Sequence, residues 1–174
     1  EISACLVGSE MCIRDSSHTE EVPSFLPDRF EPGTPNIPGI LGLHAALCDL
    51  EQTDMGKLHQ HELELTQYFI NGLMQMDPSE STLRAIGKHN TIERTSVVSV
   101  QTLQTDMARV AYEMDDTYGI MTRVGLHCAP SAHKTLGTYP EGTIRFSFGP
   151  ENTHHEVDLA LHALAEITGS PYHL

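Results

Sequence analysis

Apolar residues recur at helical spacing in four stretches of the chain, and this pattern predicts four amphipathic helices. The helices are expected at residues 40–50, at residues 54–76, at residues 104–118, and from Thr153 to residue 167. The second helix carries an apolar stripe of Leu58, Leu65, Phe69, Leu73 and Met76. Asp54 is suited to cap the second helix, and Thr153 with Glu156 forms a capping-box pattern at the last one.

Between these helices the pattern changes to that of strands. Strands are expected at residues 82–87, 95–102, 120–124 and 142–148. In the last strand, Thr143, Arg145 and Ser147 alternate with Ile144, Phe146 and Phe148, which predicts one polar and one buried face. The third strand is expected to carry Arg123 at its end. A short helix is expected from Pro130, because proline suits the first helical turn.

The order α-β-β-α-β-β-α over residues 54–168 predicts an α+β domain, with a small, mainly antiparallel sheet and helices on one face. Residues 17–38 are rich in proline, glycine and acids and are predicted to form an irregular loop. Residues 1–16 match no pattern that follows and lack the features of a signal peptide. They resemble translated sequencing-adapter read-through, and we interpret them as a non-native segment.

Composition and charge disfavour several classes of partner and site. The net charge of −14, with ten lysines and arginines, argues against binding nucleic acid or an anionic membrane. No apolar run approaches the ~18 residues of a membrane span. The cysteines Cys5, Cys12, Cys48 and Cys128 lack paired spacing, so we expect neither a disulfide framework nor a zinc site. The histidines are scattered, no other metal site is predicted, and a reducing, cytoplasmic compartment is expected.

The candidate chemistry is concentrated in Arg-Val-Gly-Leu-His-Cys-Ala-Pro, residues 123–130, and in Arg145 on the next predicted strand. The Cys128 thiol is a candidate nucleophile or a packing residue. Arg123 and Arg145 could clamp a small carboxylate, or they could be a strand-end surface residue and an inter-strand ion pair. His127 could assist the thiol or simply face a carbonyl. Cys48 lies in an apolar helical pattern and is predicted to be in the core.

These motifs resemble a known family. Arg-x-Gly-x-His-Cys-Ala, then Gly-Thr-x-Arg-x-Ser, then Asn-Thr-x-x-Glu-Val-Asp are similar to the C-terminal domain of cysteine desulfurases. These are pyridoxal-phosphate (PLP) enzymes of the class V aminotransferase family, in the branch of SUF-type desulfurases and selenocysteine lyases. Residues 29–36, Arg-Phe-Glu-Pro-Gly-Thr-Pro-Asn, resemble the segment that joins the two domains of the family. The resemblance implies that residues 17–52 end the α/β large PLP-binding domain, and that residues 53–174 form the C-terminal small domain of a fold-type I PLP enzyme.

The resemblance also implies roles for individual residues. Cys128 would take the sulfur of substrate L-cysteine as a persulfide and release L-alanine, with His127 beside it. Arg145 would grip the substrate carboxylate, with Arg123 and Asn36 as further substrate contacts. Cofactor contacts would come from Gly33 and Thr34, with Thr34 reaching the PLP phosphate across a homodimer interface.

The family's Schiff-base lysine lies upstream of the segment resembled by residues 29–36. Lys134 follows His133, as that lysine follows a histidine, but it comes after the Cys128 motif and is not its counterpart. The sequence is therefore interpreted as a fragment, inactive by itself, of a homodimer that supplies sulfur to an acceptor, for example in iron–sulfur cluster assembly. The alternatives are a selenocysteine lyase, another class V enzyme, or a non-enzymatic α+β interaction module.

Overall fold

A computed structural model describes residues 24–27, 29–30 and 35–171, and the chain divides after Thr53 into two compact units. In the first unit, helix α2 spans Ile37–Gln52. Its N-cap is Asn36, whose side-chain oxygen accepts the backbone N–H of Gly39 at 3.1 Å. This cap, followed by proline in the first turn, explains why the helix begins before the expected residue 40.

Helix α2 is less buried than its sequence indicates. None of its residues is buried, and Ile40, Leu43 and Leu47 are exposed. The prediction that Cys48 belongs to the core is wrong for the described structure. Its side chain is half-exposed, with Sγ 3.8 Å from His44 Nδ1, because the described residues of this unit provide no apolar surface to cover it.

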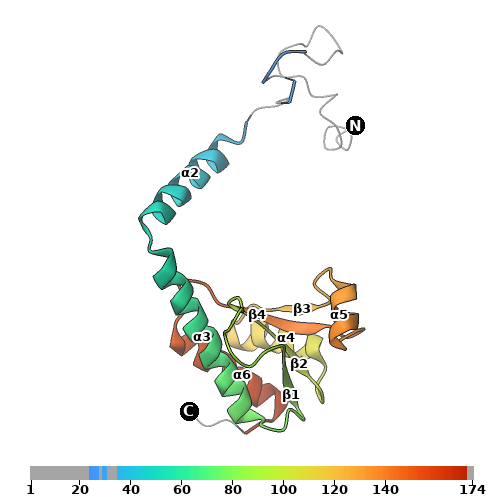
Figure 1. The fold of residues 1–174 in the computed structure, drawn as a ribbon. Coiled ribbons are helices and arrows are strands. Elements are labelled where there is room, and N and C mark those ends of the chain that lie inside the picture. The colour runs from blue at the N-terminus through green and yellow to red at the C-terminus, as the bar shows by residue number, and fades with distance from the viewer. Residues whose placement is uncertain (1–23, 28, 31–34, 172–174) are drawn as a thin grey trace. The chain divides into compact units, whose positions relative to one another are not determined.

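The second unit is built on a four-stranded sheet with the order β1-β2-β4-β3 (Figure 1). Its strands are β1 Leu83–Ile86, β2 Val97–Thr102, β3 Arg123–Gly125 and β4 Thr143–Ser147. Every neighbouring pair is antiparallel. The predicted α+β class, with an antiparallel sheet packed against helices, is confirmed.

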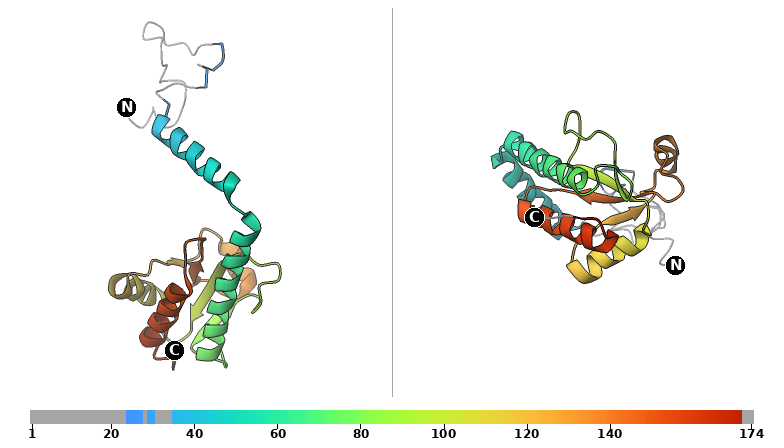
Figure 2. Two further views of the ribbon diagram at one scale, coloured as in Figure 1. Left: turned by 90° about the vertical axis from the view of Figure 1, so that its left-hand side faces the viewer. Right: turned by 90° about the horizontal axis from the view of Figure 1, so that it is seen from below.

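Three helices cover one face of this sheet. They are α3 Met55–Met76, α4 Met107–Tyr118 and α6 His154–Thr168, and α3 and α6 lie side by side in both views of Figure 2. The Phe69 ring of α3 meets Phe146 of β4 at a centroid distance of 4.7 Å. At Gly72 a Cβ would lie 2.3 Å from Leu161 Cδ1, so this glycine lets the two helices approach. The apolar side of the sheet is therefore closed, and its opposite side carries the polar residues.

The starts of α3 and α6 follow the predicted caps, whereas α4 begins at Met107 with Asp106 as its N-cap and not at the expected residue 104. Thr153 and Glu156 form the predicted capping box, and the Asp54 side chain accepts two backbone N–H groups of α3. Helix α4 ends at left-handed Gly119, and the N–H of Ile120 donates to Met114 O at 2.8 Å. Because Ile120 completes this cap, β3 begins at Arg123. The expectation that Arg123 ends a strand of residues 120–124 is wrong.

The polypeptide between β3 and β4 contains the short helix α5 Pro130–Leu136 and leaves the sheet between two glycines. Gly125 and Gly142 both have positive φ, at 109° and 83°. A Cβ on Gly142 would lie 2.3 Å from the carbonyl carbon and oxygen of Gly125. The missing side chain of Gly142 permits this close approach, whereas a Cβ on Gly125 would meet no atom within 4 Å. This contact closes the base of residues 126–141.

Gly142→Ala should therefore weaken the base of this segment. We expect the free energy of unfolding, measured by urea denaturation, to fall by about 2–3 kcal/mol, because a left-handed alanine is strained and its Cβ pushes the two strands apart. Gly137→Ala is the matched control. Gly137 also has positive φ, at 70°, but no atom lies within 4 Å of an added Cβ. Equal losses in the two variants would show that the contact between the glycines contributes nothing.

Candidate active site

Two arginines lie opposite each other on the face of the sheet that the helices leave open. Arg123 of β3 pairs in register with Arg145 of β4, and Ser99 of β2 is the partner of Arg145 on the other side. Neighbouring residues Ile144 and Phe146 are buried in the core, so the alternation of β4 points Arg145 away from it.

The charges of this pair are not compensated within the described residues. Like charges directly opposite on adjacent strands destabilise a sheet. Neither guanidinium has a hydrogen bond or an ion pair with any described residue, and Arg145 Nε is buried without a partner. Buried donors in folded proteins are nearly always satisfied, so an unpaired one calls for an explanation. A bound anion would satisfy both guanidinium groups at once.

The surrounding sheet surface is basic in a chain that is acidic overall. The four strands contain the three arginines Arg84, Arg123 and Arg145 and neither aspartate nor glutamate, although the net charge of the chain is −14. Arg84 has one side-chain partner, because its Nη2 donates to the Gln101 side-chain oxygen, although its Nε, like that of Arg145, is buried without a partner among the described residues. The Gln101 amide in turn donates to Gly142 O at 3.2 Å. Arg123 and Arg145 therefore remain as the candidate anion-binding groups.

His127 lies beside these arginines. Its Nε2 is 3.3 Å from the hydroxyl of Thr143, a buried residue on the same face of β4 as Arg145. Burial of the ring and then the positive charge of Arg145 lower the pKa of His127 below its ordinary value, with smaller contributions from His133 and Arg123. This lowered pKa favours the neutral imidazole, which can accept a proton.

Cys128 follows on an exposed and strained loop. The residues His127 and Cys128 have φ angles of 49° and 59°, both in the left-handed region. Such a conformation costs roughly 1–2 kcal/mol for each residue other than glycine. The turn is closed by the Ala129 N–H, which donates to Leu126 O at 2.8 Å, and the Cys128 thiol is exposed. Strain of this kind is often found at functional sites, where the surrounding structure maintains it.

The structure brings together only part of the predicted site. Arg123, Arg145 and His127 meet on one face, and Cys128 adjoins them in sequence. Asn36 belongs to the other unit, where its side chain caps α2. The cofactor-binding residues predicted from the sequence, Gly33 and Thr34, lie outside the described residues.

Sequence reasoning missed the residues that support this arrangement. Thr143 was expected on the polar face of its strand, but its hydrogen bond to His127 was not foreseen. Gln101, which engages Arg84 and ties β2 to Gly142, gave no signal beyond its place in a strand. Both contacts join residues far apart in the sequence, so no local pattern shows them.

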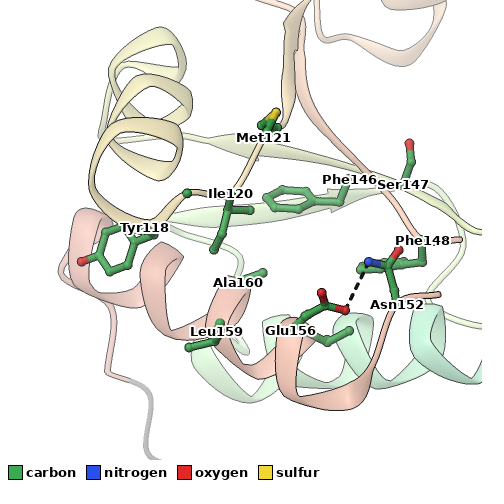
Figure 3. Close-up of a pocket in the computed structure, with 12 residues that line it drawn as sticks. Tyr118, Ile120, Met121, Phe146, Ser147, Phe148, Asn152, Glu156, Leu159 and Ala160 are labelled. Atoms are coloured by element: carbon green, nitrogen blue, oxygen red, sulfur yellow. Dashed lines mark hydrogen bonds between the residues drawn. The ribbon is translucent and has the colours of Figure 1, made fainter.

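A cavity of about 340 Å³ lies apart from the predicted residues, where α4 ends and α6 begins (Figure 3). Phe146 and Phe148 form part of its wall, and the Asn152 amide donates to Glu156 at 3.3 Å at its edge. The Glu156 carboxylate also accepts the Thr153 N–H at 2.8 Å, in the cap of α6. Asn152 and Glu156 at the edge of the cavity thus take part in the cap of α6. None of the candidate catalytic residues lines this cavity.

The chain was compared with known proteins. The profile of the aminotransferase class-V family matches residues 1–160. A probable cysteine desulfurase of Staphylococcus epidermidis is 34% identical over 141 residues, which are 81% of this chain and 32% of the relative. One of Pyrococcus abyssi is 34% identical over 144 residues, which are 83% of this chain and 34% of the relative. The chain therefore spans about a third of the length of these relatives.

Solved structures show the same fold. The apo structure of a cysteine desulfurase from Thermococcus onnurineus NA1 superposes with a TM-score of 0.72 at 32% identity, covering 91% of this chain and 38% of that one. A cysteine desulfurase from Escherichia coli superposes with a TM-score of 0.65 at 24% identity, covering 92% of this chain and 37% of that one. With a family profile that matches nearly the whole sequence, and with relatives that are cysteine desulfurases, the chain belongs to the aminotransferase class-V family.

Proposed function

We propose that the chain is the C-terminal part of a longer PLP-dependent cysteine desulfurase, which converts L-cysteine to L-alanine and passes the sulfur to Cys128. The observation that supports this most strongly is the pair of unpaired guanidinium groups beside the imidazole of His127, which is followed in sequence by the exposed thiol of Cys128. Such a pair is suited to the carboxylate of an amino acid, and the adjacent thiol is suited to accept sulfur.

The described residues do not by themselves form a PLP site. The lysines of the chain are Lys57, Lys88 and Lys134, and each is exposed with a surface contact of its own. Lys57 pairs with Asp54 at 3.7 Å, Lys88 pairs with Glu93 at 3.0 Å, and Lys134 lies over the Tyr139 ring at 5.1 Å. We therefore assign the lysine and most phosphate contacts to the part of the protein that this sequence does not include. When bound, PLP provides the electron sink that this class of chemistry requires.

Arg145 would hold the substrate by its carboxylate. A guanidinium presents its N–H groups in a fixed planar fork, which matches the two oxygens of a carboxylate. Arg123, directly opposite, adds a second positive charge to the same position. A carboxylate bound between the two guanidinium groups would be attracted by both and would offset their mutual repulsion. The site would therefore bind an amino acid, which has a carboxylate, in preference to an amine that lacks one.

His127 and Cys128 would carry out the sulfur transfer. The neutral imidazole takes the proton from the thiol, because only the thiolate is nucleophilic. The Cys128 sulfur then forms a bond with the substrate sulfur while the carbon–sulfur bond of the substrate breaks. The electron pair of the broken bond stays on the substrate carbon, which takes up a proton to give alanine, and Cys128 is left as a persulfide.

The exposure of Cys128 would suit the delivery of sulfur to an acceptor. We further propose that the whole enzyme is a cytoplasmic homodimer, in which Thr34 contacts the cofactor of the partner subunit.

The titration of His127 tests the electrostatics of the site in the chain itself. We expect the NMR-monitored midpoint of its imidazole to lie below about 6.5, the ordinary value for histidine. The unfolded state then binds a proton to this imidazole at higher pH than the folded state does. The contribution of His127 to the free energy of unfolding is therefore present above about pH 6.5 and is lost as the pH falls through the midpoint of the folded state. Arg145→Met should raise the midpoint, since it removes a neighbouring positive charge.

His59, which is exposed on α3, provides an internal reference in the same spectra. Arg109→Met is the matched variant, because it removes a positive charge from an exposed position on α4. An unchanged His127 midpoint in Arg145→Met would contradict the contact between these two charges.

The proposed reaction is tested in the longer protein that contains this chain, loaded with PLP. With L-cysteine, mass spectrometry should detect a persulfide on Cys128 as alanine forms. Cys128→Ala should abolish the persulfide and leave the cofactor absorbance unchanged, because the thiol is needed for sulfur transfer and not for binding the cofactor.

Cys48→Ala is the control and should behave as the wild type. Alanine formation from cysteine by Cys128→Ala at the wild-type rate would exclude the thiol from the mechanism. Alanine formation from selenocysteine but not from cysteine by the wild-type protein would instead identify a selenocysteine lyase.

A further inference from the structure

His133 is buried although it lies on the short helix α5, where almost every other side chain is exposed. Only 6% of its surface is accessible, and its Nδ1 lies 2.6 Å from the Thr138 hydroxyl. Thr138 is fully buried. Neither residue belongs to the apolar core under the sheet, so their burial needs another explanation.

Thr138 is held firmly by backbone hydrogen bonds. Its N–H donates to His133 O at 2.9 Å, and its carbonyl accepts the N–H of Gly142 at 2.7 Å. Gly142 in turn packs on Gly125 at the start of β4. The His133 imidazole is thus anchored, through Thr138, to the point where the polypeptide re-enters the sheet.

The ring of His133 packs against the ring of His127. Their centroids are 5.9 Å apart with an interplanar angle of 44°. His127 also forms its hydrogen bond with Thr143 of β4. The imidazole of His127 therefore contacts both the His133 ring of α5 and a hydroxyl of the sheet.

We propose that His133 is a positioning residue for the reactive loop, residues 126–129. Its imidazole, fixed by Thr138, holds His127 against Thr143 and thereby keeps Cys128 in its left-handed conformation. The functional meaning of this arrangement rests on the proposed role of Cys128, but the arrangement can be tested without substrate or cofactor.

Backbone strain in residues 127 and 128 explains why the contact from His133 is needed. Two successive left-handed residues other than glycine persist only where their surroundings favour them more than the relaxed alternatives. The Cys128 side chain is exposed and makes no hydrogen bond with the described residues, so it cannot provide that support itself. The side chain of its neighbour His127 is held by two contacts, one with Thr143 and one with His133.

The test compares His133→Ala and Thr138→Val with the wild-type chain and with His59→Ala, which changes an exposed histidine on α3. Two signals are followed by NMR. One is the titration midpoint of His127, which is surrounded by Arg145, Arg123 and His133. The other is hydrogen exchange of the Ala129 amide, whose bond to Leu126 O closes the loop.

In His133→Ala, the His127 midpoint should rise toward its ordinary value, because the ring becomes hydrated, and Ala129 should exchange about tenfold faster through local opening. Thr138→Val keeps the shape of the side chain but removes the hydroxyl, and it should shift both signals in the same direction. His59→Ala should change neither signal.

If folded His133→Ala kept both the His127 midpoint and the Ala129 exchange rate, His133 would not position the loop. Should His133→Ala fail to fold, Thr138→Val decides, and unchanged signals in that variant would overturn the proposal. Failure of Cys128 to form a persulfide in the longer protein would leave both signals unaffected, so the two proposals fail separately.

Discussion

Arg123 and Arg145 face each other across β3 and β4 with no counter-charge among the described residues. A protein stabilises such a pair only when the rest of the fold compensates for the repulsion. Here the compensation lies on the opposite face of the same strands. Ile144 and Phe146, the neighbours of Arg145 in sequence, are buried against α3, α4 and α6. Because side chains of β4 alternate between the two faces of the sheet, burial of Ile144 and Phe146 in the core fixes the position of Arg145 on the opposite face.

The reactive loop depends on the same two strands. Gly125 and Gly142 bring β3 and β4 into backbone contact where the loop leaves and re-enters the sheet. From this base, Thr143 contacts His127 on one side and His133 packs against it on the other. Burial of the ring and then the charge of Arg145 lower the pKa of His127. The opposed arginines and the strained residues His127 and Cys128 therefore all lie within residues 123–145, and the helices pack on the other face of the sheet.

Much of this fold could be predicted from the sequence because its signals are local. The Thr153 and Glu156 capping box, the N-cap Asp54 and the alternation of β4 all occupy the predicted positions. The resemblance to cysteine desulfurases, stated from three short motifs, is confirmed by the family match.

The errors came from interactions that a local pattern cannot show. The strand expected from residue 120 begins at Arg123, because Ile120 is needed to complete the end of α4. The apolar pattern of α2 predicted burial for Cys48, but burial requires a partner surface that its unit does not provide among the described residues. The contact of His133 with His127 depends on how α5 folds back toward β4. The predicted roles of Cys128, Arg145 and Thr34 remain predictions.

The central claim is that Arg123 and Arg145 are placed for an anion and at some cost to stability. The most direct measurement is the free energy of unfolding, by urea denaturation at low salt, of Arg123→Met, Arg145→Met and the double variant. Methionine keeps the apolar stem of the side chain and removes the charge.

The account predicts that each single variant is as stable as the wild type or more stable by up to about 1 kcal/mol, and that the second substitution adds less than the first. Arg109→Met, which breaks the exposed pair with Glu113, should instead lose a small amount of stability. A loss of more than about 1 kcal/mol in Arg145→Met would show that this arginine stabilises the sheet, and would contradict the account.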